Sequence, residues 1–362
     1  MSLILFIFIL VALILVHEFG HFVVAKAFRI RVDEFGIGFP PRLLARRVGE
    51  TLYTFNVVLV GGFVRIFGED GNEAADNPHS FSNKPRLVQA GVVVAGVFFN
   101  ILFAWLAFSA GYMVGLPTPA AHDGFGQVQD ASPMIVGVRA GSPAELAGLK
   151  PEDVVVSLQT GNGASTPAAA TAKQVREFIA QHQEESVLLT VLRDGAEKVF
   201  LAKATEGLID GRKAIGIEVE DVGILQLPPH LALLQGALAT KNTTIAVAEG
   251  LVGFFSQLVR GAADFGSVAG PIGIATLGAT AVGQGVVPAL VLTALISINL
   301  ALINLLPIPG LDGGRLLIIG IESILRHPVP ERLTTILTIA SFTLLITLML
   351  VVSYHDILRL VS

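Results

Sequence analysis

The sequence predicts a polytopic α-helical membrane protein with four transmembrane helices and an inserted β-rich domain. Of its 362 residues, 52% are hydrophobic and 15% are charged, whereas an average soluble domain has roughly 25% charged residues. Four apolar stretches reach the length of about 20 residues that a spanning helix needs. A polar segment with short β-rich runs separates the second stretch from the third. The net charge of −5 offers no basic face to nucleic acid.

The four expected spans follow from runs that hold few or no charged residues. They lie at about residues 2–25, 90–115, 286–306 and 334–354. The first span contains His17 and Glu18 in an otherwise apolar stretch. It lacks the basic start and the small-residue cleavage site of a signal peptide, so we expect it to remain as a helix. The third span is one part of a charge-free, glycine-rich run over 265–311.

The distribution of basic residues predicts the orientation in the membrane. Nine Lys and Arg residues fall within 26–86 and three more lie in the loop between the third and fourth spans, whereas 123–264 has 11 basic and 17 acidic residues. Short basic loops stay in the cytoplasm, and four spans place both termini on one side. We therefore expect an inner (plasma) membrane protein whose termini and middle domain are extracytoplasmic.

The soluble middle domain is expected at 123–221, between a first region over 1–122 and a connecting segment over 222–285. One helical stretch at 172–183 is surrounded by five β-rich runs at 134–138, 154–158, 187–192, 198–202 and 215–219. One or more amphipathic helices, which could lie on the membrane surface, are expected over 228–264. The connecting segment as a whole, up to residue 285, is expected to be amphipathic or re-entrant. The last two spans then occupy 286–362.

One motif in the middle domain resembles the PDZ pattern. The run VGVRAGSPAELAGLKPEDVVV at 136–156 opens a short helix at Ser142 and closes it at Gly148, although Glu152-Asp153 stands where Gly-Asp is usual. A PDZ domain takes an extended peptide as an added strand. A generic β-rich spacer is the alternative interpretation.

The sequence His17-Glu18-Phe19-Gly20-His21 in the first span is an HExxH motif. On a helix this spacing puts both imidazoles on one face, where they can bind Zn²⁺ with Glu18 as the general base. Ionisable residues inside a span usually mark function, because burying them there is costly. The alternative is a helix end with two interfacial histidines and a Glu that extends to the interface.

A third zinc ligand is needed for a catalytic site, and Asp312 is the candidate. It is the one Asp or Glu within 265–320, and it lies in NLLPIPGLDGG at 304–314, directly after the third span. Its prolines prevent a regular helix, and such broken backbone at membrane depth is tolerated where it is packed in protein or lines a wet cavity. A loop with a solvated Asp is the alternative. The sequence has no cysteine, which excludes thiolate ligands and a cysteine nucleophile.

Together the two metal motifs resemble the site-2 protease family of intramembrane zinc metalloproteases, in its bacterial regulator-of-sigma-E type with a PDZ domain. GGFVRIFGE at 61–69 looks like the family's membrane-associated β region. AGVFFN at 95–100 resembles its AGPxxN pattern, with Val97 in place of proline, and GPIG at 270–273 resembles the segment before the third span. One PDZ-like domain fits in this chain, whereas that branch often carries two.

The resemblance implies His17, His21 and Asp312 as zinc ligands and Glu18 as the base. It implies that Asn304 contacts the substrate backbone or the developing oxyanion, with a helix-cap or packing role as the alternative. Asn100 faces the same choice, and we assign it no catalytic role.

The implied function is regulated cleavage, within the lipid bilayer, of a transmembrane segment of a single-pass partner such as an anti-sigma factor. Prior trimming of the partner is expected, and a strand near 51–67 could pair with the unwound substrate. Removal of remnant signal peptides is a second use of the same chemistry. A PDZ-bearing scaffold or transporter with a vestigial metal site is a third possibility, against which the intact motifs argue.

The PDZ-like domain could control access as a size filter or as a peptide receptor. Glu152-Asp153 and the acidic surroundings would not favour a free carboxylate, so we expect the filter.

Overall fold

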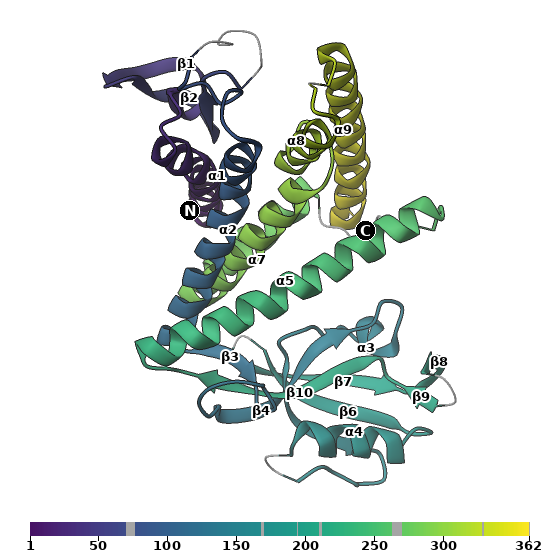
Figure 1. The fold of residues 1–362 in the computed structure, drawn as a ribbon. Helices are drawn as coiled ribbons and strands as arrows, with labels where there is room; N and C mark the ends of the chain where they lie inside the picture. The colour runs from purple at the N-terminus through teal and green to yellow at the C-terminus, as the bar shows by residue number, and fades with distance from the viewer. Residues whose placement is uncertain are drawn as a thin grey trace. The chain divides into compact units, whose positions relative to one another are not determined.

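The computed structural model describes residues 1–69, 77–167, 170–193, 195–209, 212–262, 270–327 and 329–361 (Figure 1). The chain divides into two compact units. We call Met1–Gly111 together with Gly236–Ser362 the membrane unit, and Tyr112–Gln235 the β unit. The start of the expected run over 265–311 lies outside the described residues, which resume at Gly270.

Among the described residues, four helices are long and apolar enough to cross a membrane. They are α1 (Ser2–Ala27), α2 (Arg86–Val114), α7 (Val286–Leu305) and α9 (Glu331–Val361). They overlap the expected spans, because each span was placed on a long apolar run with few charged residues and these helices form on the same runs. In α9 only 6% of the apolar stretch is buried within the chain, so the rest presents an apolar surface suited to lipid.

The antiparallel pair of β1 (Val32–Val48) and β2 (Thr51–Ile66) lies beside α1 (Figure 1). The strand expected near residues 51–67 is β2. The pair folds back on itself, since residues 34–37 pair with 62–65 on one side and with 52–55 on the other. Residues 62–65 therefore form an edge of this small sheet among the described residues. A Cβ atom on Gly62 would lie 2.7 Å from the Leu15 side chain, so glycine lets this edge approach α1 closely.

The connecting segment forms two helices. One continuous helix, α5 (Pro229–Val259), occupies most of 228–264, and α6 (Pro271–Gln284) follows. A Cβ atom on Gly278 of α6 would lie 2.3 Å from the Phe6 ring of α1. Asp356 of α9 accepts hydrogen bonds from the backbone N–H groups of Gly270 (3.2 Å) and Gly273 (2.8 Å), which satisfies donors at the start of α6. The α6 helix, which lies after the stretch 228–264 where surface helices are expected, is therefore packed within the membrane unit.

The β unit is built on a six-stranded antiparallel sheet in the order β3-β10-β4-β5-β6-β7. Its strands are β3 (Leu116–Pro119), β4 (Gln129–Val138), β5 (Val154–Thr160), β6 (Ser186–Arg193), β7 (Ala196–Lys203) and β10 (Ile217–Leu225). A separate pair comprises β8 (Thr205–Ile209) and β9 (Arg212–Ala214), and the helices are α3 (Pro143–Leu146) and α4 (Ala172–Gln181).

The core of the β unit contains fully buried side chains from the sheet and from α4, among them Ile135, Leu158, Val175 and Leu189. The unit extends beyond the expected 123–221 on both sides. The reason is that β3 pairs with the last residues of β10, and Gln235 accepts a hydrogen bond from the Phe125 N–H at 2.9 Å. Neither pairing leaves a signal in the local sequence pattern.

Asp153 is a buried structural charge of the β unit, with 0% of its surface exposed. Two nitrogens of Arg193 donate to its carboxylate at 2.5 Å and 2.6 Å, and the Lys150 N–H donates at 2.9 Å. Burial alone would raise the pKa of this carboxyl, but the Arg193 guanidinium and the Lys150 N–H together outweigh burial and hold the pKa below the usual value. Asp153 is therefore neutralised by its partner and presents no free negative charge at the surface.

A candidate metal centre in the membrane unit

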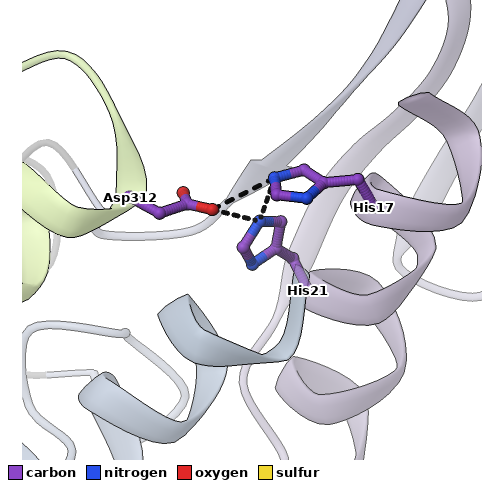
Figure 2. A group of neighbouring side chains, drawn as sticks. All are labelled: His17, His21 and Asp312. Atoms are coloured by element: carbon purple, nitrogen blue, oxygen red, sulfur yellow. Dashed lines mark hydrogen bonds and ion pairs between the residues drawn. The ribbon is translucent and has the colours of Figure 1, made fainter. Parts of the chain in front are cut away.

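The metal centre begins with α1, which carries His17, Glu18 and His21. The two histidines are one helical turn apart, and their Nε2 atoms lie 3.2 Å from each other (Figure 2). Only 6% of His17 and 7% of His21 is exposed. Two buried imidazoles whose nitrogens point at one place are typical of metal ligands.

Asp312 reaches the same place from the other end of the chain. The helix α7 ends at Leu305, and after a non-helical stretch the next helix, α8 (Asp312–Leu325), begins at Asp312 itself. A Cβ atom on Gly313 would lie 2.1 Å from the Leu305 carbonyl oxygen, and one on Gly314 would lie 2.2 Å from that of Ile308. Glycine at both positions therefore allows the tight turn that brings Asp312 to face the histidines (Figure 2).

The three side chains fit a zinc ion. Asp312 Oδ2 lies 3.0 Å from His17 Nε2 and 3.3 Å from His21 Nε2, and the two nitrogens are 3.2 Å apart. Ligands at 2.0–2.1 Å around a tetrahedral zinc are separated by roughly 3.3 Å. Asp312 Oδ2 is also buried without a well-directed hydrogen bond from the described residues. Three protein ligands leave the fourth position for a water or a substrate oxygen.

Glu18 and Asn304 both lie at this centre. Glu18 Oε2 accepts a hydrogen bond from the Val64 N–H at 3.0 Å, so the edge of β2 holds the carboxylate. Asn304, near the end of α7, places its Nδ2 atom 3.4 Å from His17 Nε2. The structure thus brings together all five residues that the sequence motifs singled out.

The contribution of α2 to this centre was not predicted from the sequence. A Cβ atom on Gly20 would lie 2.5 Å from the Ala95 carbonyl oxygen, so α1 and α2 touch at the metal centre. The carbonyl oxygen of Val92 lies 2.8 Å from His21 Nδ1, and Asn100 Nδ2 lies 3.2 Å from His17 Nδ1. The AGVFFN pattern marked the Asn100 region, but a backbone carbonyl such as that of Val92 has no signature in sequence.

The site combines two histidines and one aspartate with the Glu18 carboxylate, which the Val64 N–H keeps in place. Because it lies on helices suited to a bilayer, this arrangement is that of a membrane-embedded metallohydrolase. Comparison with known proteins agrees. The model described as "Peptidase family M50" matches residues 5–348. The chain belongs to this family, the site-2 proteases. It is therefore a zinc metalloprotease and a multi-pass membrane protein, and its cofactor is Zn²⁺.

Several relatives resemble the chain over almost its whole length. A protein of Synechocystis sp. named "Putative zinc metalloprotease" is 32% identical, with 97% of this chain and 93% of the relative covered. Relatives with the same description occur in Nostoc sp. (34% identity, 92% and 89% covered) and Clostridium perfringens (32% identity, 96% of each covered). The family to which the motifs pointed is thereby confirmed.

Proposed function

We propose that this protein cuts a transmembrane segment of a single-pass membrane protein, with Zn²⁺ held by His17, His21 and Asp312. The observation that carries the proposal is that both histidines lie inside α1, whose apolar stretch has the highest mean hydropathy of the four candidate spans. Peptide bonds that reach this centre are therefore those of a segment within the bilayer. An anti-sigma factor that has already been trimmed is the substrate type that the motif resemblance favours.

The chain's own residues account for the proton transfers of hydrolysis. When bound, Zn²⁺ polarises the scissile carbonyl and makes water a better nucleophile. Glu18 takes a proton from the attacking water and delivers it to the nitrogen that leaves as the C–N bond breaks. Because the Val64 N–H donates to Oε2, we assign this transfer to the other oxygen, Oε1. The Asn304 amide donates a hydrogen bond to the oxygen on which negative charge develops.

Two features near Glu18 support binding of an unwound segment. The edge at 62–65 offers backbone hydrogen-bonding groups to an extended peptide, except for the Val64 N–H, which donates to Glu18. A pocket of about 470 Å³ is lined mainly by aromatic and aliphatic side chains, among them Phe19, Phe22 and Tyr53. An apolar side chain of a transmembrane segment would fill such a pocket.

The proposal is tested by zinc content and cleavage together. Purified wild-type protein should hold about one zinc per chain and should cut a transmembrane substrate inside its apolar segment, as located by mass spectrometry. Asp312→Ala should lose most of the zinc and the cleavage, because two ligands hold zinc far less tightly than three. Asp33→Ala, a carboxylate paired with Arg31 away from the centre, is the matched control. Unchanged zinc and cleavage in Asp312→Ala would remove Asp312 from the ligand set.

We also propose that the protein lies in the plasma membrane with both termini and the β unit outside the cytoplasm. The basic side chains of β1 and β2 support cytoplasmic placement of that pair. A reporter inserted at Gly49, in the β1–β2 turn, should be cytoplasmic, and one at Gly195, in the β6–β7 turn, extracytoplasmic. A Cβ atom on either glycine would have no neighbouring atom within 4 Å, so both turns have room for an insertion. The opposite pattern would invert the orientation.

The β unit is, we infer, a PDZ-like domain whose peptide site is the groove between α4 and the start of β10. The groove has a volume of about 520 Å³ and includes Ile179, Ile215 and Ile217. Arg176 of α4 donates to the Val219 carbonyl of β10 at 2.7 Å. Glu152 and Asp153 are not among the residues that line it, and Asp153 is neutralised by Arg193. The acidity of this pair therefore gives no reason to prefer a size filter over a peptide receptor.

A further inference from the structure

The second ring nitrogen of each histidine constrains how the metal can bind. An imidazole that binds a metal through Nε2 carries its proton on Nδ1, and that N–H group needs an acceptor. His21 has one, since its Nδ1 lies 2.8 Å from the Val92 carbonyl oxygen. His17 Nδ1 faces the side chain of Asn100 at 3.2 Å. Both partners belong to α2, a different helix from the one that carries the histidines.

The partners lie on one stripe of α2 with Gly96 between them. Val92, Gly96 and Asn100 are spaced by four residues, so they occupy the same face of the helix. A Cβ atom on Gly96 would lie 2.4 Å from His21 Nε2 and 2.7 Å from His17 Cε1, so both rings lie directly over this glycine. We call these three residues the α2 stripe.

Asn100 is fixed in place and has an unsatisfied atom. The residue is fully buried, with 0% of its surface exposed, and its backbone carbonyl accepts a hydrogen bond from Ser297 Oγ of α7 at 2.8 Å. Its side-chain oxygen Oδ1 has no hydrogen-bond partner among the described residues. The two ends of a carboxamide have nearly the same shape, so a half turn about its last torsion exchanges oxygen and nitrogen at no steric cost.

We propose that Asn100 is a positioning residue for the metal centre, with its Oδ1 atom accepting the proton of His17 Nδ1–H. The amide in this arrangement is turned by a half rotation from the one in which Nδ2 faces the ring. The inference deepens the proposed function, because it rests on His17 binding zinc through Nε2. The α2 stripe then fixes both ligand rings. The Val92 carbonyl orients His21, the Asn100 side chain orients His17, and Gly96 between them leaves room for the two rings.

The apolar surroundings make this acceptor important. A ring N–H group that is buried without an acceptor costs free energy, and water at membrane depth is scarce. Without Asn100, His17 would favour the tautomer or rotation that leaves Nε2 unsuited to the metal. The alternative is that Asn100 only fills space and joins α2 to α7.

The test compares Asn100→Asp with Asn100→Leu in the purified full-length protein, with zinc affinity measured by chelator competition. Asp keeps an acceptor oxygen in nearly the same shape, so its zinc affinity should stay within about threefold of the wild type. Leu has similar volume and no acceptor, so its affinity should fall about 10–100-fold, the usual effect of removing such a partner. A space-filling role predicts the reverse order. Asn299→Leu is the control, because Asn299 bonds to Leu295 of its own helix.

A second measurement does not depend on the variants being folded. In zinc-loaded wild-type protein, ¹⁵N spectra of labelled histidine should show His17 protonated at Nδ1, and an unprotonated Nδ1 would overturn the proposal. Wild-type zinc affinity in Asn100→Leu would overturn it as well. Failure of the proposed function is distinguishable, since zinc binding would then persist in His17→Ala.

Discussion

Replacing Glu18 by Gln is expected to abolish peptide hydrolysis while leaving the fold and most of the zinc in place. Gln has the same shape but cannot take a proton from water, and loss of a general base costs at least roughly 10²–10⁴-fold in rate. The substitution is also gentle on the structure. The Gln side-chain oxygen can still accept the hydrogen bond from the Val64 N–H that Glu18 Oε2 accepts at 3.0 Å.

The measurement is the cleavage rate of a transmembrane substrate, with zinc content and thermal stability recorded on the same sample. Glu18→Ala is the instructive comparison, because it leaves the Val64 N–H without its partner and should also loosen the edge at 62–65. Glu50→Gln, in the exposed β1–β2 turn, controls for loss of a carboxylate and should behave as the wild type. Wild-type turnover by the Glu18→Gln protein would refute its role as the base. The inactive protein would also retain substrates, which distinguishes anti-sigma factors from remnant signal peptides.

Gly96→Ala should empty the metal centre although it adds a single methyl group. The added Cβ atom would lie 2.4 Å from His21 Nε2 and 2.7 Å from His17 Cε1, distances that side chains do not tolerate. Either the rings or α2 must move, and both movements separate the ligands. Alanine is otherwise the better helix residue by about 1 kcal/mol. If the histidine rings did not lie over Gly96, the substitution would therefore be expected to raise the stability of the protein and to leave its zinc affinity unchanged.

Zinc competition on the purified protein checks this second expectation. The affinity in Gly96→Ala should fall by more than the about 10–100-fold that loss of a supporting hydrogen bond costs, because the ligands themselves are displaced. Gly91→Ala, one turn and a half earlier on the same helix, is the matched control. A Cβ atom there has no neighbour within 4 Å, so zinc affinity should not change. Equal zinc affinity in the two variants would contradict the close contact of α1 and α2.

The parts of this structure that sequence predicted are those with a local or one-residue signal. The thickness of a bilayer fixes the length of an apolar run, which locates α1, α2, α7 and α9. The two histidines are predictable because helical spacing alone puts them on one face. Asp312 is predictable because few carboxylates occur near it in an apolar region.

Other parts depend on contacts between distant residues. The fold-back of β1 onto both halves of β2 and the pairing of β3 with β10 follow from no local pattern. Asp153 is part of the acidity that we expect to disfavour a free carboxylate, whereas Arg193, forty residues later, neutralises it. The hydrogen-bond partner that α2 provides for His21 is a main-chain carbonyl oxygen. Because every residue has such an oxygen, the sequence cannot single this one out. Such contacts depend on how distant segments pack together, and no local sequence pattern records that packing.

The division of the metal centre among α1, α2 and α8 has a consequence for how the protein is made. The histidines of α1 are synthesised before α2, and both helices precede the β unit. Asp312 emerges only after the β unit and α7 have been produced. A nascent chain that has not yet reached α8 therefore has a zinc site that lacks one ligand. Because all three ligands are needed for the zinc site, proteolytic competence is thereby delayed until α8 has been made.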